Sequence, residues 1–259
     1  MSEFVQETTA LTWRWVRRLS REPMSLAFGL IQPMLFWLIL FGNLFKKAAQ
    51  IPGMEDGLDY ISFLTAGVIV MTVLNSGLAG GIDLLFDKEN GFLERLMSAP
   101  ISRNSLIVSR FIFVMGITTL QILIMLLVAF ILFGVHVASG FPGIVMTIII
   151  GLLFGIGLIA LSLALAFAVK SHGSFFSLLG FLSLPLIFLS TALVPRDIMP
   201  GWMSFLAQFN PMTYTIDVVR SLILGGWNWG QVAQVTLVLL LFDGICFWIA
   251  GRAFKKNLG

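Results

Sequence analysis

Six long apolar stretches decide what this chain can fold into. They cover about residues 24–45, 60–86, 105–133, 141–169, 174–194 and 232–250. Each is close to or above the about 20 residues that a tilted helix needs to cross the hydrocarbon core of a bilayer. The composition agrees, because 58% of the 259 residues are hydrophobic and only 11% are charged, which excludes an ordinary soluble globule. We therefore predict an all-α integral membrane protein with six transmembrane helices.

The basic residues predict the orientation of these spans, since Lys and Arg near span ends stay on the cytoplasmic side. With the N-terminus inside, twelve of the sixteen basic residues fall on the cytoplasmic side, namely Arg14, Arg17, Arg18, Arg21, Lys88, Arg95, Arg103, Arg110, Lys170, Arg252, Lys255 and Lys256. The opposite side holds Lys46, Lys47, Arg196 and Arg220. This asymmetry predicts that both termini are cytoplasmic, and it explains the high pI without nucleic acid.

Residues 1–22 form a separate predicted element, an N-terminal cytoplasmic helix at the membrane interface, and 23–259 form the transmembrane domain. Phe4, Leu11, Trp15 and Leu19 recur at helical spacing, while four arginines gather on another side. A basic amphipathic helix favours the headgroup region. The alternative is a simple positive-inside anchor. No cleavable signal peptide is expected, because the first apolar stretch follows a charged segment and is as long as a full span.

A short polar segment, residues 87–100, separates the second and third predicted spans. If residues 89–99 are helical, Phe92, Leu93, Leu96 and Met97 share one face, and Glu89, Asn90, Glu94, Arg95 and Ser98 share the other. This helix is too short to span a bilayer, so we expect it to lie at the cytoplasmic surface within reach of a soluble partner. The alternative is an ordinary tight loop between two spans.

Residues 195–229 are too long for a simple loop and too interrupted for a span. Pro195, Pro200, Gly201 and Pro211 break their apolar pattern. We predict short helices that dip into the outer leaflet, where surrounding protein tolerates their irregular backbone.

Asp243 lies near the middle of the last predicted span, where an ionised acid is costly. It is either functional or part of a tight polar packing site beside Gly244 and Cys246. The isolated His136 and His172 do not suggest a metal site, and a single cysteine excludes an internal disulfide.

Two blocks resemble a known family. The segment Glu89-x-Gly91-x-Leu93-Glu94-x-Leu96-x-x-x-Pro100 resembles the signature of the ABC-2 type transporter permeases. Residues 185–220, with Asn210-Pro211-Met212-Thr213-Tyr214 and Asp217-x-x-Arg220, are similar to the daunorubicin-resistance (multidrug) branch of that family. One departure is Phe92, which stands where the family often has Thr.

The resemblance implies two functional sites. A coupling helix would contact an ATPase through Glu89, Gly91, Phe92, Leu93, Glu94, Arg95, Leu96 and Pro100. Re-entrant helices would cap the pathway outside, with Asn210, Pro211, Tyr214, Asp217 and Arg220 lining or bracing an outer gate. The alternative for Asp217 and Arg220 is a weak interfacial ion pair.

The chain carries no Gly-x-x-x-x-Gly-Lys-Ser/Thr loop and no His-Glu-x-x-His motif, so we expect no enzymatic activity and no cofactor in it. ATP and Mg would be bound by a separate ABC ATPase subunit. A second copy of the permease, or a paralogous permease, would complete the transporter in a bacterial-type cytoplasmic membrane. The resemblance implies export of a hydrophobic, drug-like or lipid-like substrate. The alternatives are a polysaccharide or lipid-linked glycan exporter, an ion-coupled secondary transporter that uses Asp243, and a membrane scaffold.

Overall fold

The computed structural model describes residues 3–21, 23–44, 57–99, 101–169 and 171–258, which contain helices and no strand. The helices are α1 (Glu3–Arg21), α2 (Pro23–Gln32), η1 (Pro33–Phe41), α4 (Gly57–Ala79), α5 (Ile82–Glu89), α6 (Phe92–Ser98), α7 (Arg103–Phe133), α8 (Gly140–Ala168), α9 (His172–Phe188), η2 (Arg196–Ile198), α10 (Gly201–Ala207), α11 (Pro211–Arg220), η3 (Ser221–Gly225) and α12 (Trp229–Leu258). The predicted all-α class is confirmed for these residues.

Four helical segments are long and apolar enough to cross a membrane: Tyr60–Glu89, Arg103–Phe133, Gly140–Ala168 and Trp229–Ala253. The first predicted span corresponds to α2 and η1, whose apolar part is short, and the fifth corresponds to α9, which has 17 residues. Helix α9 ends at Phe188, before the predicted end at residue 194. Six spans therefore remain a prediction, while four candidate spans are present in the described chain.

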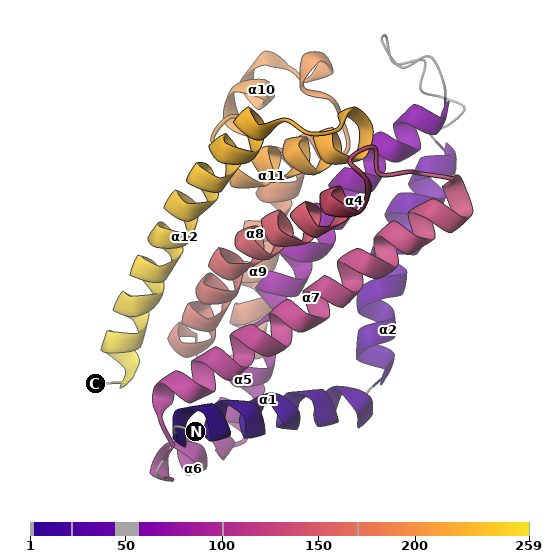
Figure 1. Ribbon diagram of the computed structural model, residues 1–259. Coiled ribbons are helices and arrows are strands. Elements are labelled where there is room, and N and C mark those ends of the chain that lie inside the picture. Colours follow the sequence, from indigo (N-terminus) through magenta and orange to yellow (C-terminus); the bar gives the residue numbers. More distant parts are fainter. Residues whose placement is uncertain (1–2, 22, 45–56, 100, 170, 259) are drawn as a thin grey trace.

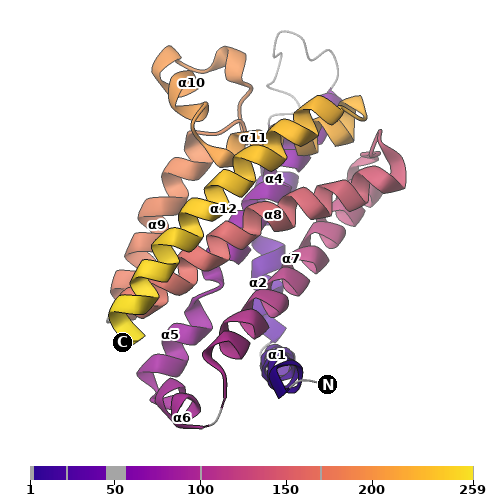
Figure 2. The same ribbon diagram turned by 60° about the vertical axis from the view of Figure 1, so that its left-hand side comes forward.

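The two ends of the helical bundle differ. Figure 1 shows α1 lying across the end of the bundle that also holds α6 and the C-terminal end of α12, while α10 and α11 lie at the opposite end. The rotated view in Figure 2 shows the same arrangement. Helix α1 and the C-terminal end of α12 therefore lie at the same end of the bundle, and the side of the membrane on which they lie stays a prediction. Lys46, Lys47, Pro100 and Lys170 lie outside the described residues.

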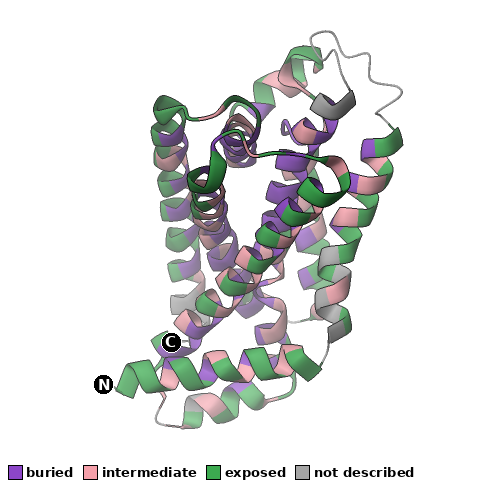
Figure 3. Cartoon of the chain, turned by 45° about the vertical axis from the view of Figure 1, so that its right-hand side comes forward, coloured by how far each residue is buried: buried purple, intermediate pink, exposed green. Residues whose placement is uncertain are grey.

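Helix α4 forms the centre of the bundle. In the most apolar stretch of its candidate span, 83% of the residues are buried, whereas the corresponding share for α12 is 28%. Glycines let neighbours approach closely, because a Cβ at Gly77 would lie 2.8 Å from Cβ of Leu158, and one at Gly67 would overlap the carbonyl of Ala192. Figure 3 shows the resulting buried interior and the exposed outer faces of the surrounding helices.

The outer faces of these helices are strongly apolar. Exposed side chains include Ile131 on α7, Phe181 and Phe188 on α9, and Leu241 and Ile245 on α12. A soluble protein rarely exposes apolar surface of this extent. The helices therefore present a surface suited to lipid, and the chain is an integral membrane protein.

Helix α1 is fixed against α7 at the end of the bundle. Trp15 is 1% exposed, and Leu11 is buried beside it. The carboxylate of Glu7 accepts hydrogen bonds from the Ser105 hydroxyl (2.7 Å) and from the Ser102 N–H (3.1 Å). These hydrogen bonds lower the pKa of Glu7 below its ordinary value, because they favour the charged form.

Candidate coupling and gate sites

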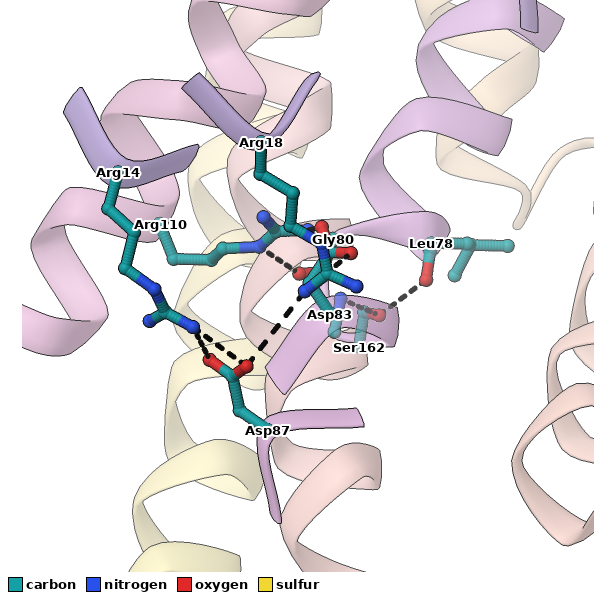
Figure 4. Close-up of polar contacts among 9 residues, drawn as sticks. Arg14, Arg18, Leu78, Gly80, Asp83, Asp87, Arg110 and Ser162 are labelled. Carbon is teal, nitrogen blue, oxygen red and sulfur yellow. Dashed lines mark hydrogen bonds and ion pairs between the residues drawn. The ribbon is translucent and has the colours of Figure 1, made fainter. Parts of the chain in front are cut away.

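The second predicted span is not one continuous helix, and this break organises the site (Figure 4). Between α4 and α5 the chain turns at Gly80 and Gly81, so the second predicted span, 60–86, consists of two helices within the candidate span Tyr60–Glu89. The Gly81 N–H donates to Oγ of Ser162 (2.9 Å), and this hydroxyl donates to the Leu78 carbonyl. A Cβ at Gly81 would overlap the Ser162 backbone. Helix α8 thus provides hydrogen-bond partners for backbone groups that have lost their helical partners at the break.

Arg110 of α7 binds both the turn between α4 and α5 and the first turn of α5. Its Nε donates to the Gly80 carbonyl (2.6 Å), and its Nη2 lies 2.6 Å from Oδ2 of Asp83. Both charged residues fall inside predicted spans, although Asp243 was the only intramembrane charge predicted. A buried guanidinium is tolerated here because it has a carboxylate and a carbonyl as partners.

Helix α1 adds a second ion pair to α5. Nη2 of Arg14 donates to both oxygens of Asp87, at 2.8 and 2.7 Å, and Arg18 lies 3.7 Å from Asp83. The Arg14 guanidinium also lies over the ring of Phe92, 4.1 Å from its centroid. The arginines and the aspartates are each four residues apart, so matching helical faces form the contact. This shared spacing was the signal in the sequence that could have predicted the cluster.

The end of α5 is bound to two further helices. Nζ of Lys88 donates to the carbonyls of Phe167 and Val169, both at 3.0 Å, at the C-terminal end of α8. A cation at this position complements the helix dipole. The Glu89 carboxylate contacts Nδ1 of His172 at the start of α9. Glu89 is exposed at this end of the bundle, as predicted for its charge, and it also contacts His172.

The predicted helix over 89–99 is shorter than expected. Glu89 ends α5, and Gly91 adopts a left-handed conformation with φ of 67° before α6 begins at Phe92. This conformation favours glycine because it carries no Cβ. The turn changes the direction of the chain between α5 and α6, which remain in contact.

The faces of α6 agree in part with the prediction. Leu93 is 5% exposed and Leu96 is partly buried against the core, whereas Phe92 is 36% exposed beneath Arg14. Glu94 and Arg95 are exposed and form no ion pair with another described residue. The side chain of Met97 lies outside the described residues. Glu94 and Arg95 are therefore the charged groups of α6 that remain available to a partner.

At the opposite end, Asn210 joins α9 to α11. Its Nδ2 donates to the carbonyls of Leu186 (2.8 Å) and Leu189 (2.7 Å), and its Oδ1 accepts the Met212 N–H, which caps α11 ahead of Pro211. These bonds explain why α9 ends early, since Asn210 satisfies its last carbonyls. The Tyr214 hydroxyl donates to the Gln208 carbonyl and closes the turn between α10 and α11.

Arg220 binds α11 to α4 and to the segment after α9. It donates to the Thr191 carbonyl (2.6 Å), lies 3.3 Å from Oδ1 of Asp217 and stacks 3.5 Å from the ring centroid of Phe63. Asp217 in turn accepts a hydrogen bond from Thr191 (2.7 Å). The Arg220 side chain is 14% exposed. The geometry is therefore that of a brace rather than of an exposed surface ion pair.

Asp243 lies buried where α12 packs on α8. It is 6% exposed, and a Cβ at Gly157 would overlap its Oδ1. This oxygen has no hydrogen-bond partner among the described residues. Cys246 is buried one turn further along α12, and Gly244 is exposed. Asp243 thus sits in a tight contact that depends on glycine, apart from both clusters described above.

The family model described as ABC-2 type transporter matches residues 6–224. The chain belongs to the ABC-2 type transporter family. This ABC-2 chain is 35% identical to a putative transport permease, ycf38, of Porphyra purpurea, over 99% of this chain and 91% of that protein. It is 24% identical to the daunorubicin resistance ABC transporter permease protein DrrB1 of Streptomyces coeruleorubidus, over 91% of this chain and 82% of the other. It is 27% identical to the probable doxorubicin resistance ABC transporter permease protein DrrC of Mycobacterium tuberculosis, over 96% and 84%. The resemblance to ABC-2 permeases is confirmed.

Proposed function

We propose that this chain is the permease subunit of an ATP-driven exporter that moves a hydrophobic, drug-like or lipid-like substrate out across a bacterial-type cytoplasmic membrane. A separate ABC ATPase would bind ATP and Mg and dock at the end of the bundle that carries α1 and α6. The relatives named for daunorubicin and doxorubicin resistance support an export role. The end of the bundle that holds α6 would face the cytoplasm, as the basic residues predict.

The observation that carries this proposal is the way α5 is connected. Asp83 pairs with Arg110 on α7, and Asp87 pairs with Arg14 on α1. Lys88 binds the end of α8, and Glu89 contacts the start of α9. A displacement of α6 by a partner therefore reaches four helices through the neighbouring α5. An ordinary surface loop would not need these connections.

The outer end has the complementary role in this proposal. Asn210, Tyr214 and the Arg220–Asp217 pair hold α10 and α11 as a compact cap over α9 and α4. The cap would move as a unit when the pathway opens outward. We further propose that two permease chains surround the pathway, either two copies of this chain or this chain and a paralogous permease. Two copies would be related by a twofold axis, which is the commonest symmetry of protein dimers.

A second candidate function follows from Asp243. A buried carboxylate with an unpartnered oxygen in a spanning helix is typical of proton or ion pathways. An ion-coupled secondary transporter would use it to bind the driving ion. The two functions differ in energy source, which an experiment can separate.

The coupling role of α6 is tested by a matched pair of charge reversals. Glu94→Lys changes an exposed acid on α6, and Asp197→Lys changes an exposed acid at the opposite end of the bundle. Neither side chain has an ion pair with another described residue, so both variants should insert and fold normally. We expect Glu94→Lys to reduce copurification of the ATPase or to uncouple ATP hydrolysis from transport, and Asp197→Lys to do neither.

Leu96→Asp provides a stronger change on the same helix, because it places an unpaired charge on the partly buried face of α6. We expect it to lose the ATPase. The coupling assignment is rejected if a chain that carries both Glu94→Lys and Leu96→Asp copurifies with the ATPase and exports at the normal rate.

A further inference from the structure

A cavity of about 300 Å³ lies between α1, α2, α4, α5 and α7, and part of the charge cluster lines it. Trp15 lines it from α1, Gly29 from α2, Asn75 from α4 and Gln121 from α7. It is distinct from α6, from the outer cap and from Asp243. A volume of this size lies at the lower end of the range for small-molecule sites.

Three side chains that line this cavity each retain an unpartnered polar atom. These atoms are Nε1 of Trp15, Nη1 of Arg110 and Oε1 of Gln121, and none has a hydrogen-bond partner among the described residues. The three residues are 1%, 4% and 7% exposed. Buried polar groups in proteins are nearly always paired, so three of them around one cavity indicate a missing partner. Two of the atoms belong to donors and one is an acceptor.

Two carboxamides occupy the middle of candidate spans. Asn75 lies 15 residues after Tyr60 and 14 before Glu89, and Gln121 lies near the middle of α7. Asn75 is exposed, and no hydrogen bond of its side chain is found in the described part of the chain. Lipid chains offer no hydrogen bonds at this depth, so such a group is costly unless a ligand or another protein group pairs with it.

The α7 side of the cavity is apolar between two polar ends. Arg110 and Gln121 are eleven residues apart on α7, which corresponds to about 16 Å along the helix axis. Phe113, Val114 and Ile117 line the cavity between them. A ligand that contacts both ends therefore needs an apolar body with polar groups at two positions.

The charges favour one class of ligand. The cavity lining contains two guanidinium groups, those of Arg18 and Arg110, and one carboxylate, that of Asp83. The wider cluster adds Arg14 and Asp87 and keeps the same excess of one positive charge. A cationic head would be repelled, whereas a singly negative or neutral head would be accepted.

We propose that this cavity binds an elongated amphiphile with a singly negative or neutral hydrogen-bonding head, which lies near Arg110 and Arg18, and with a second polar group paired to Asn75 and Gln121. The amphiphile is either the exported substrate, a role that rests on the function proposed above, or a resident membrane lipid of the same chemistry.

The site is tested on the full chain in nanodiscs of neutral lipid, with three probes that share a 14-carbon chain and a photoreactive diazirine. Their heads are phosphoglycerol (one negative charge), phosphocholine (zwitterionic) and trimethylammonium (one positive charge). The concentration for half-maximal crosslinking is measured. We expect the phosphoglycerol probe to bind about tenfold more tightly than the trimethylammonium probe, with crosslinks in α4 and α7.

Variants separate the two ends of the site. Gln121→Leu and Asn75→Leu should each weaken binding of the phosphoglycerol probe about tenfold, as expected for the loss of a buried hydrogen bond. The control is Thr119→Val on α7, which removes a hydroxyl bonded only to its own helix at Met115 and should change nothing. Arg18→Gln should weaken binding of the phosphoglycerol probe and leave binding of the phosphocholine probe unchanged.

The source of the ligand is decided by adding the phosphoglycerol probe to the complex with the ATPase. Stimulated ATP hydrolysis that Gln121→Leu abolishes identifies a substrate site. Binding without stimulation identifies a resident lipid, and the export function is then tested by the α6 variants alone. Equal binding of all three probes, or crosslinking that neither carboxamide variant affects, would overturn the proposed site.

Discussion

The break between α4 and α5 gives a quantitative prediction about Ser162. Its hydroxyl is fully buried, accepts the Gly81 N–H at 2.9 Å and donates to the Leu78 carbonyl. Ser162→Ala leaves both backbone groups without this partner in an interior that water does not reach. An orphaned buried group costs about 1–3 kcal/mol, so the loss of stability should be about 2–4 kcal/mol when relaxation recovers part of it.

The control is Ser109→Ala on α7. Ser109 is equally buried, but its hydroxyl donates to the carbonyl of Leu106 within the same helix (2.8 Å). That carbonyl lies within the helix, so this variant should cost less than about 1 kcal/mol. Both variants are compared by equilibrium unfolding in mixed micelles with added sodium dodecyl sulfate. Equal destabilisation of the two would refute the reasoning that Ser162 replaces backbone hydrogen bonds at the break.

Three further results are expected. Hydrogen bonds from the start of α7 lower the pKa of Glu7 below its ordinary value of 4.5, so they stabilise the contact of α1 with α7 above that pH and are lost as the pH falls through the lowered pKa. Spin-label distances between α1 and α7 should therefore lengthen as the pH is lowered below 4.5, and this pH dependence should vanish in Glu7→Gln. A double-mutant cycle of Arg14→Ala and Asp87→Ala should give a coupling energy of about 1–2 kcal/mol in the same unfolding assay, and a value near zero would remove α1 from the coupling network. In a Cys246→Ala background, Phe181→Cys on the exposed face of α9 should crosslink identical chains in native membranes, whereas crosslinks seen only on overexpression would argue against a homodimer through this face.

Periodicity and length were sufficient to predict the long helices. Helices α7 and α8 begin and end within a few residues of the predicted spans, because each is a long apolar run with a capping or turn residue at its ends. The N-terminal amphipathic pattern likewise predicted α1, whose Leu11 and Trp15 are buried. Hydrophobic periodicity and helix length are local properties, so they can be recognised in the amino-acid sequence alone.

The breaks and their partners could not be predicted in the same way. The turn at Gly80 and Gly81 depends on Ser162 and Arg110, which are distant in sequence and supply the hydrogen bonds that a continuous helix would make internally. The early end of α9 depends on Asn210 in the same manner. The contact of Glu89 with His172 likewise joins two helices that are distant in sequence. All of these features depend on tertiary contacts, which cannot be predicted from the hydropathy pattern.

The energy source of transport distinguishes an ATP-driven permease from an ion-coupled transporter. The chain is reconstituted in proteoliposomes with its ATPase, and movement of an amphiphile is followed with ATP alone, with a proton gradient alone and with neither. We expect transport with ATP only, with a reduced rate in Glu94→Lys and at most a partial reduction in Asp243→Asn. Transport driven by the proton gradient without ATP, and abolished by Asp243→Asn, would contradict the ATP-driven function.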